Sequence, residues 1–466
     1  MRISLASVFR EPSRLAAALG ATLQARGCVC SVIGGITTDS RRTEAGDLFV
    51  ARKGRGQNGL DFIGEALARG ACAVLAETEP PFYAENCLWL RVPDCDAALL
   101  AAAAARRQKT RATVIAVSGS TGKTTVKELL ATVLGEVGTV QSSAGNYNST
   151  VGMPLSLLGM EEADYFVLEI GINHKNEMEP LSRALAPDIA VLTNVGTAHI
   201  GQYGNYATLL EEKLKLSCGL RENGVLVLPD SIPKAALSGI SSPMLRFGST
   251  QGCDVRVCRA VSHELGVTAD ILTPARALNG LCWHIPGSIG TSCLAIAAAV
   301  GTLLEVPDAA IRHGIAKAVR TSPRMQRIEV AGRVLIDDTY NASPEAVVAS
   351  LEALCYLGKD APRAAVLGDI GELGEQAATL HRTVGRCAAG CGLAQLFLYG
   401  EYASVLAAGA QEGGMPKACI KTFAAGQEAE LASALLSATP KGTYILLKAS
   451  RKTALERVIE ALRRER

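Results

Sequence analysis

The sequence is short of aromatic residues, of net charge and of long apolar runs. Aromatics make up only 4% of its 466 residues, which suits closely packed α/β layers better than a β-sandwich or a barrel. The 47 basic residues are nearly balanced by 45 acidic ones, so neither nucleic acid nor an anionic membrane surface is an expected partner. No run of about 18 apolar residues occurs, and the first residues lack the apolar stretch of a secretory leader. We therefore expect a cytoplasmic protein that does not insert into membranes.

Paired cysteine motifs are also missing. The 14 cysteines are scattered along the chain and do not form the two C-x-x-C pairs that are typical of a zinc site. We expect most of them to be small buried side chains in a reducing compartment. The composition, 48% hydrophobic and 20% charged, is that of a globular chain, and the length predicts roughly three domains.

The order of apolar runs and turn residues predicts an α/β protein with domains at residues 1–88, 89–318 and 319–466. In the first domain we expect strands at 47–51 and 73–76 and a helix at 62–69. In the second, an alanine-rich helix at 97–108 leads to a buried strand, and further strands follow. This alternation favours a parallel, doubly wound sheet, with strands at 113–117, 165–170, 189–193 and 225–228.

The third domain is expected to be Rossmann-like, because buried strands again alternate with helical stretches. The strands are expected at 334–336, 364–367, 395–398 and 444–447, and the helices at 344–354 and 376–389.

A glycine-rich segment joins the expected strand 113–117 to an expected helix at 126–134. Glycines let successive backbone N–H groups face one concavity, and the helix N-terminus adds positive potential, so the segment predicts a phosphate-binding loop. Lys123 is placed to reach the outer phosphates of ATP, and the Thr124 hydroxyl to bind Mg²⁺. Val117 stands where the general Walker pattern has glycine, so the loop is a G-x-x-G-K-T variant. The predicted ATP-binding residues are Gly119, Ser120, Thr121, Gly122, Lys123, Thr124 and Thr125.

Polar residues at two further strand ends suit a metal site. Glu169 ends one expected strand, and a carboxylate there is the usual partner of a phosphate-binding loop because Mg²⁺ prefers oxygen ligands. His199 follows the next strand, at the carboxyl edge where parallel sheets bind their ligands. The nearby segment TNVG lacks the N-K-x-D pattern of a GTPase. The residues alone therefore leave open an ATPase or a small-molecule phosphotransferase.

Several motifs together resemble the Mur ligases, which join amino acids to the UDP-muramoyl peptide precursor of the bacterial cell wall. The resemblance covers nearly the whole chain. It rests on TDSR (38–41), GDLF (46–49), GSTGKTTVKE (119–128), GNYNSTVGMP (145–154), LEIGINH (168–174), TNVGTAHI (193–200) and DTYNASP (338–344). The stretch LGDIGELGEQAATLH (367–381) is similar to the branch of the family that adds D-alanyl-D-alanine, and the D-N-P-R-like stretch of the diaminopimelate or lysine branch is absent.

The resemblance implies a fold and a reaction. An N-terminal domain holds the uridine nucleotide, a central P-loop domain holds ATP, and a Rossmann-like domain follows. ATP phosphorylates the terminal carboxylate of UDP-N-acetylmuramoyl tripeptide. The amine of D-alanyl-D-alanine then attacks the acyl phosphate, leaving an amide, ADP and phosphate. Such catalysis consists mostly of charge neutralisation and positioning.

The resemblance also implies roles for single residues. Lys123, Glu169, His199 and Lys213 are the expected catalytic residues, with one Mg²⁺ on Thr124 and Glu169 and a second on His199 and a carbamylated Lys213. By its position alone, Lys213 is a solvated helix lysine. The C-terminal domain is expected to offer Arg324, Asp338 and Asn341 to the nucleotide. The expected substrate residues are Ser40, Arg41, Asn146, Asn148, Lys448 and Arg451; Lys448 and Arg451 can also be read as a strand-end lysine and a surface arginine.

The chain departs from the family pattern around the expected adenine site. Ile289, Gly290 and Cys293 replace a histidine and two asparagines, so we expect base recognition through backbone and apolar contacts. Smaller departures are Leu60, Ser149 and Ala449. The alternatives are another Mur branch, a folylpolyglutamate-synthase-like ligase, and an inactive nucleotide-binding homologue. We expect a monomer.

Overall fold

The computed structural model describes residues 1–26, 30–54, 56–79, 85–145, 147–318 and 325–464. They form two compact units. One consists of Met1–Ser118, Gly138–Ala190 and Leu214–Leu226, and the other of Gly119–Val137, Val191–Lys213 and Val227–Arg466. Among the described residues, no helix is both long and apolar enough to cross a membrane. Three mixed or parallel sheets confirm the predicted α/β class, whereas the predicted domain boundaries stay predictions.

The N-terminal sheet has four parallel strands at its centre and an antiparallel strand at each edge. Its order is β1-β3-β4-β5-β6-β2, in which β3 to β6 run parallel. The predicted strands at 47–51 and 73–76 and the helix at 62–69 are confirmed to within a residue. The elements are β1 (Arg2–Ser4), α1 (Pro12–Leu19), β2 (Thr22–Arg26), β3 (Gly35–Thr37), β4 (Asp47–Val50), α2 (Ile63–Ala68), β5 (Ala73–Ala76) and β6 (Cys87–Arg91).

The central sheet has nine strands in the order β15-β14-β13-β12-β11-β10-β7-β9-β8. Its strands are β7 (Thr113–Ser118), β8 (Val140–Ser142), β9 (Tyr165–Glu169), β10 (Ile189–Leu192), β11 (Val225–Pro229), β12 (Met244–Gly248), β13 (Val255–His263), β14 (Gly266–Leu272) and β15 (Ala277–Trp283). Its helices are α3 (Cys95–Lys109), α4 (Lys123–Leu134), α5 (Gly152–Gly159), α6 (Met178–Leu185), α7 (Ile200–Tyr203), α8 (Tyr206–Leu214), α9 (Gly287–Leu303) and α10 (Asp308–Ala318).

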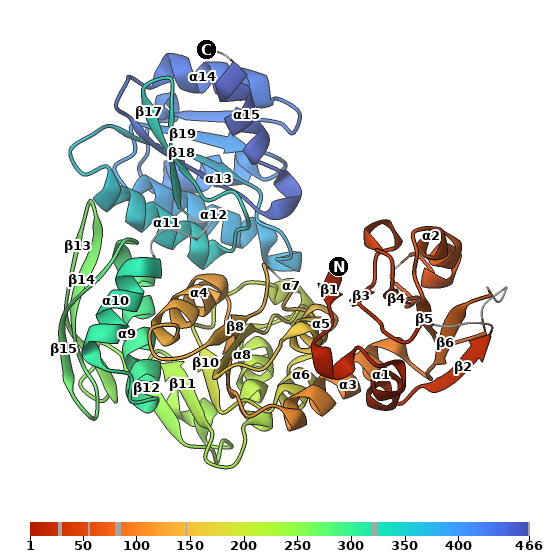
Figure 1. The fold of residues 1–466 in the computed structure, drawn as a ribbon. Helices are drawn as coiled ribbons and strands as arrows, with labels where there is room; N and C mark the ends of the chain where they lie inside the picture. The colour runs from red at the N-terminus through yellow and green to blue at the C-terminus, as the bar shows by residue number, and fades with distance from the viewer. Residues whose placement is uncertain (27–29, 55, 80–84, 146, 319–324, 465–466) are drawn as a thin grey trace. The chain divides into compact units, whose positions relative to one another are not determined.

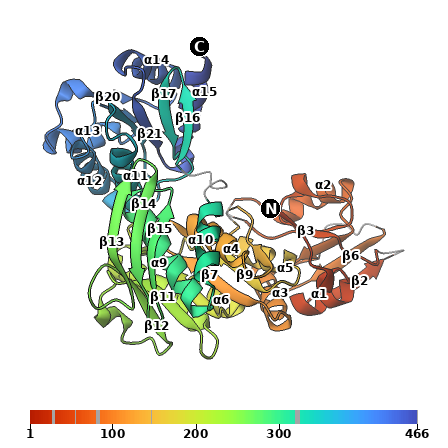
Figure 2. The ribbon, with the colours of Figure 1, turned by 60° about the vertical axis from the view of Figure 1, so that its left-hand side comes forward.

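The predicted parallel central sheet is confirmed, and it is extended by three strands that were not predicted. β8, β9 and β7 do run parallel, but β13, β14 and β15 form an antiparallel meander, seen in Figure 2 as long neighbouring strands. These strands expose many of their side chains, whereas β7 and β9 are buried almost throughout. A half-exposed strand lacks the continuous apolar run by which buried strands are recognised, so the meander was missed.

Two consecutive arginines of α3 fix the start of β7, the strand that leads into the glycine-rich loop. Arg107 is buried and donates to the carbonyl of Leu185 and to the carboxylate of Asp188, at 3.0 and 2.7 Å. Asp188 also accepts the backbone N–H of Val114 at 2.8 Å. Arg106 donates to the Met160 carbonyl at 2.8 Å. A buried guanidinium is stable only when such partners satisfy it, so these contacts tie α3 to its neighbours.

The C-terminal sheet confirms the predicted Rossmann-like domain. Its order is β16-β17-β21-β18-β19-β20, parallel except for the edge pair β16 and β17. Figure 1 shows α14 and α15 together on one side of the sheet and α11 and α12 on the other. The elements are β16 (Gln326–Val330), β17 (Arg333–Asp337), α11 (Pro344–Leu357), β18 (Arg363–Gly368), α12 (Ala377–Ala389), β19 (Gln395–Tyr399), α13 (Ala403–Glu412), β20 (Ile420–Phe423), α14 (Glu428–Ala438), β21 (Tyr444–Lys448) and α15 (Glu456–Arg464).

A buried ion pair lies at the carboxyl end of this sheet. Lys448 ends β21 and Asp338 follows β17, its parallel neighbour. The side chains are only 2% and 6% exposed, and Nζ lies 2.5 Å from Oδ2. Ser350 adds a hydrogen bond to the same carboxylate oxygen at 2.8 Å, and Lys448 Nζ also donates to the Asn341 carbonyl at 3.1 Å. The pair is thus fully enclosed and well satisfied.

Replacing one partner should therefore cost much more stability than an ordinary surface change. We expect Lys448→Met to lower the free energy of unfolding of the C-terminal domain by about 3–5 kcal/mol, because it leaves the Asp338 carboxylate buried and unpaired. Urea unfolding followed by domain-specific fluorescence or hydrogen exchange measures the change. Lys441→Met, at an exposed lysine, is the control. Equal unfolding curves for the two variants would contradict the expectation.

Candidate active site

The glycine-rich loop has the backbone that the sequence predicts. It begins where β7 ends at Ser118, and α4 begins at Lys123. Gly122 caps the helix in the left-handed conformation, with φ of 78°. Gly119 has φ of 144°, and a Cβ there would overlap the Thr193 hydroxyl. Glycine suits position 119 for two reasons. Other residues rarely adopt this φ, and each of them has a Cβ for which there is no space.

The segment after β10 holds the loop in shape through hydrogen bonds to Ser120 and Thr121. The Asn194 side chain accepts the Thr121 N–H at 2.9 Å and donates to the Thr121 hydroxyl at 2.6 Å. The Thr193 hydroxyl donates to the Thr121 carbonyl at 2.6 Å. Ser120 donates its N–H to the Asn194 carbonyl at 3.1 Å, and its hydroxyl accepts the Gly196 N–H at 2.8 Å. The loop is therefore fixed on one side by residues 193–196, a segment we refer to below as the clasp.

The start of α4 can bind an anion. Lys123 Nζ donates to the Gly119 carbonyl at 2.9 Å, so its ammonium group folds back over the loop. The first N–H groups of a helix have no partner within the helix and carry partial positive charge. Lys123 and Thr124, the first two residues of α4, are half-buried. This combination suits a phosphate chain, as the sequence predicts.

Lys213 lies in α8 and is only 2% exposed, so the reading of it as a solvated helix lysine is wrong. Burial, followed by the positive charge of Lys123, lowers the pKa of the Lys213 amine to about 7, while Glu212 acts in the opposite direction. An ordinary lysine has a pKa near 10.4. A buried lysine close to a second cation is therefore neutral for much of the time near pH 7, and a neutral amine is a nucleophile.

Glu169 is the last residue of β9 and is buried. Its carboxylate accepts a hydrogen bond from the Asn148 side chain at 2.6 Å, and its own N–H donates to the Ser143 hydroxyl at 3.1 Å. Two residues that the sequence assigns to different partners, Asn148 to substrate and Glu169 to metal, are thus in direct contact. The contact fixes the direction of the carboxylate.

His199 lies at the N-terminus of α7 in the left-handed conformation, with φ of 63°. Its ring atom Nδ1 contacts the Glu372 carboxylate, which comes from the loop that follows β18. A residue of the C-terminal domain therefore lies against the imidazole. No role was predicted for Glu372 from the sequence.

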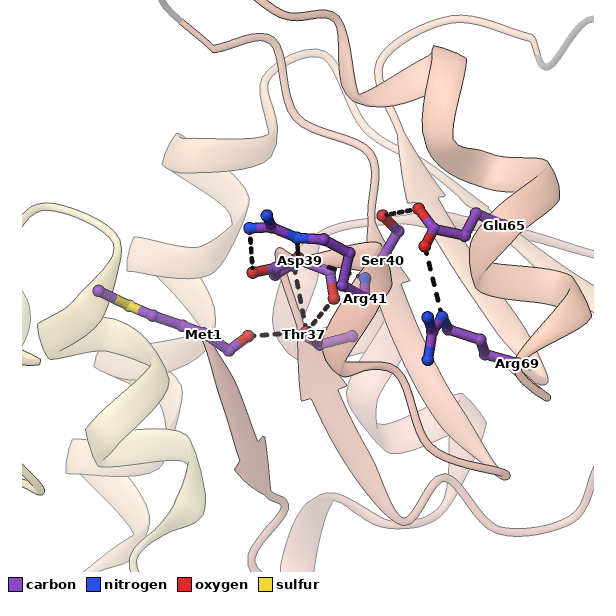
Figure 3. A network of polar contacts seen from close by, with 7 residues as sticks. All are labelled: Met1, Thr37, Asp39, Ser40, Arg41, Glu65 and Arg69. Atoms are coloured by element: carbon purple, nitrogen blue, oxygen red, sulfur yellow. Dashed lines mark hydrogen bonds and ion pairs between the residues drawn. The ribbon is translucent and has the colours of Figure 1, made fainter.

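The Ser40 and Arg41 side chains are already paired within the N-terminal domain (Figure 3). Ser40 is buried and donates to Glu65 at 2.6 Å, while Arg41 is exposed and makes two bonds of 2.9 Å to Asp39. The hydrogen bond from Arg41 lowers the pKa of Asp39. Thr37 links this turn to the Met1 carbonyl at 2.7 Å. The turn presents a cation on a rigid support, and its role toward a uridine nucleotide stays a prediction.

The remaining predicted residues differ in their surroundings. Asp338 and Lys448 pair with each other, as described above, and Asn341 is exposed. Arg451 is exposed and pairs with Glu456 at 3.0 Å. Asn146 and Arg324 lie outside the described residues. In α9, Gly290 and Cys293 are buried, and burial raises the pKa of the Cys293 thiol to about 12. The nucleotide and substrate roles of these positions stay predictions.

Magnesium fits the donor set, although no group of three His, Cys, Asp or Glu side chains within the described ranges forms a site by itself. Mg²⁺ keeps several waters and is usually held by one or two carboxylates together with substrate phosphates. In the first unit a buried, directed Glu169 supplies an oxygen donor of this kind, and in the second unit so does the Thr124 hydroxyl. Such a site does not require a cage made of protein atoms alone.

Sequence reasoning missed three supporting residues: Asn194, Ser143 and Glu372. The hydrogen bonds of the TNVG segment to the glycine-rich loop depend on the pairing of strands far apart in the chain. The only available signal was that Thr193 and Asn194 end a strand on the side of the sheet where the loop was expected.

Three family models match successive parts of the chain, and all three belong to the Mur ligases. Residues 32–109 match the model for the Mur ligase family, catalytic domain; residues 117–301 match the Mur ligase middle domain; and residues 323–451 match the Mur ligase, glutamate ligase domain. The UDP-N-acetylmuramoyl-tripeptide–D-alanyl-D-alanine ligase of Bacillus subtilis is 31% identical over 434 residues, which cover 93% of each chain. The Escherichia coli enzyme of that name is 30% identical over 92% of this chain and 93% of its own.

Solved structures give the same result. A crystal structure of MurF from Acinetobacter baumannii aligns with a TM-score of 0.87 and 28% identity over 99% of each chain. The Thermotoga maritima MurF ligase in complex with ADP aligns with a TM-score of 0.76 and 29% identity, over 92% of this chain and 97% of that one. A Mycobacterium tuberculosis folylpolyglutamate synthase shares the fold alone, at 14% identity and a TM-score of 0.60. The glycine-rich loop, the sheets around it and the full-length agreement with these relatives place this chain in the Mur ligase family.

Proposed function

We propose that this protein adds D-alanyl-D-alanine to UDP-N-acetylmuramoyl tripeptide at the expense of ATP. The chain is an ATP-dependent ligase of the Mur family, and its full-length relatives carry the name of this reaction. The observation that carries the proposal is the clasped glycine-rich loop with Lys123 at the start of α4. The folylpolyglutamate-synthase alternative is not favoured, because that likeness is one of fold alone.

The proposed reaction has two steps. A carboxylate is a poor electrophile, so a γ-phosphoryl group is first transferred to it and ADP leaves. The amine of the dipeptide then adds to the acyl carbon, loses a proton, and expels phosphate as the amide forms. The clasped loop and Lys123 hold the phosphate chain in line for the transfer and offset its charge. Mg²⁺, when bound at Thr124 and Glu169, neutralises further phosphate charge.

Lys213 supports a second, finer proposal, that its amine carries a carbamate. The neutral amine adds to CO₂ and loses one proton, which gives an N-carboxylate. Burial beside Lys123 favours this product, because a repulsive pair of cations becomes an attractive ion pair. The carbamate oxygens and His199 would then serve a second Mg²⁺, since hard cations prefer oxygen ligands.

Other residues complete the proposed substrate contacts. Contacts are proposed for Ser40 and Arg41 with the phosphates of the uridine nucleotide, for Asn146 and Asn148 with the tripeptide, and for Arg324, Asp338 and Asn341 with the adenine nucleotide. A substrate role is likewise proposed for Lys448 and Arg451. Because all three substrates are small metabolites, the enzyme is proposed to act in the cytoplasm, as a monomer, with neither nucleic acid nor membrane as partner.

Phosphate release from ATP tests the proposed reaction. With UDP-N-acetylmuramoyl tripeptide present, we expect release only when D-alanyl-D-alanine is also supplied, because the acyl phosphate needs an amine acceptor. The control reactions replace the dipeptide by glutamate or by diaminopimelate with the matching shorter precursor. Release driven by one of these instead would assign the protein to another Mur branch.

A substitution in the clasp should lower activity with ATP, because the clasp shapes the glycine-rich loop. Asn194→Asp keeps the acceptor for Thr121 but removes the amide donor and adds a negative charge near the loop. We expect kcat/KM for ATP to fall by about tenfold to a hundredfold, the equivalent of one lost buried hydrogen bond to the loop. Asn279→Asp, at an exposed position of β15, is the matched control. Equal kcat/KM values for the two variants would show that the clasp does not shape the ATP site.

Carbon-13 NMR with labelled bicarbonate tests the carbamate. We expect one carbamate carbonyl resonance that is absent from Lys213→Ala, and its intensity should rise between about pH 6 and about pH 8 as the amine loses its proton. Lys215→Ala, in the 3-10 helix that follows α8, is the control. We also expect Lys213→Ala to be nearly inactive and partly rescued by short carboxylates. A spectrum unchanged in Lys213→Ala would exclude a carbamate at this residue.

A further inference from the structure

Two loops of the second unit meet closely beside His199. One is residues 197–204, which follows β10, and the other is residues 372–376, which follows β18. Gly201 donates its N–H to the Glu372 carbonyl at 3.1 Å, and Gln376 donates to the Gly204 carbonyl at 3.2 Å. A Cβ on Gly201 would lie 2.5 Å from the backbone nitrogen of Gly374, so the two backbones are in direct contact. We call this contact the loop seam.

A neighbouring bond holds the same region from a second element. Glu345, in the first turn of α11, accepts both the N–H and the hydroxyl of Thr197, at 2.7 and 2.8 Å. The segment around His199 is therefore tied to the C-terminal domain at both of its ends. Such a double anchor fixes where each side chain along the seam points.

The two residues that face each other across the seam share an unusual backbone. His199 has φ of 63° and Glu372 has φ of 64°, in the left-handed region that histidine and glutamate seldom adopt. A residue held there costs of order 1–3 kcal/mol and persists only where its surroundings determine it, often at functional sites. Here both departures bring one carboxylate oxygen, Glu372 Oε2, against one ring nitrogen, His199 Nδ1.

The chemistry of this contact is that of an oriented metal ligand. His199 Nδ1 is buried and makes no hydrogen bond to any described residue, although the Glu372 carboxylate lies against it. A carboxylate beside Nδ1 favours the tautomer that carries its proton there, which leaves the lone pair on Nε2. Metal-bound histidines usually donate their second ring N–H to a carboxylate or a carbonyl in this way.

We propose that Glu372 is a positioning residue that holds His199 in the Nδ1–H tautomer, with Nε2 ready to bind the second Mg²⁺. The inference rests on the proposed function of His199 as a ligand of that ion. It assigns to the C-terminal domain a part in building the metal site, because Glu372 reaches His199 only while the loop seam is intact.

Nitrogen-15 NMR of histidine-labelled protein, without metal or nucleotide, tests the tautomer directly. The chain has six histidines, and a His199→Gln variant assigns the resonances of His199. We expect the wild-type ring to show a protonated Nδ1 and an unprotonated Nε2, and Glu372→Ala to shift the ring toward the Nε2–H form. Glu375→Ala, an exposed glutamate of the same loop, should leave the signals unchanged. A wild-type ring protonated at Nε2, or signals unmoved in Glu372→Ala, would overturn the proposal.

A second measurement asks whether Glu372 acts through His199. In Glu372→Ala, the Mg²⁺ concentration for half-maximal activity should rise about 10- to 100-fold, whereas Glu372→Gln, which keeps an acceptor oxygen, should lose less. In a His199→Ala background, adding Glu372→Ala should have no further effect. Additive losses in the double variant would show that Glu372 acts independently of His199 and would overturn the proposal.

The two experiments separate this inference from the proposed function. If the wild-type protein fails to release phosphate with any Mur substrate set, the proposed function fails, whatever the NMR spectra show. If phosphate release follows D-alanyl-D-alanine and the tautomer does not depend on Glu372, the proposed function stands and the positioning role is wrong.

Discussion

Hydrogen bonds from Thr193 and Asn194 to the backbone of Thr121 shape the glycine-rich loop before any phosphate arrives. The approach is so close that position 119 has no room for a side chain. A loop held in this way keeps its N–H groups and the start of α4 in fixed directions. The site therefore loses little free energy to reorganisation when an anion binds, which is the condition under which backbone dipoles stabilise charge most effectively. The strand, the clasp and the helix consequently act as one rigid support.

The charges of two lysines near the loop also affect what it can bind. Lys123 and the buried Lys213 repel each other in a poorly solvated region, and burial already pushes the Lys213 amine toward its neutral form. Glu212 offsets only part of that effect. A phosphate chain held by Lys123, or a carboxylate formed on Lys213, would each relieve the repulsion. The charge of Lys123 beside a buried amine thus favours the binding of an anion near this pair.

The sequence was a good guide to whatever depends on local pattern. Buried parallel strands such as β5, β9 and β21 have continuous apolar runs, and glycines at 119 and 122 mark a turn that few other residues can form. It was a poor guide where structure depends on distant pairing. The half-exposed meander of β13 to β15 has no continuous run, and the burial of Lys213 cannot be read from its charged neighbours in EEKLK. Asn194 and Ser143 lie in loops and strand ends whose partners are set by the order of strands in the sheet.

The stretch that distinguishes the branch in the sequence, residues 367–381, also provides Glu372 and Gly374 of the loop seam. From the sequence, the residues of this stretch are known only by their similarity to that branch of the family. The structure gives them a second use, because Gly374 permits the backbone contact with Gly201 and Glu372 then meets His199. Under the proposal above, a change at Gly374 would therefore disturb the seam and, through Glu372, the orientation of the His199 imidazole. Two left-handed residues at one close backbone contact are costly to keep, which argues that the seam serves a functional purpose beyond packing.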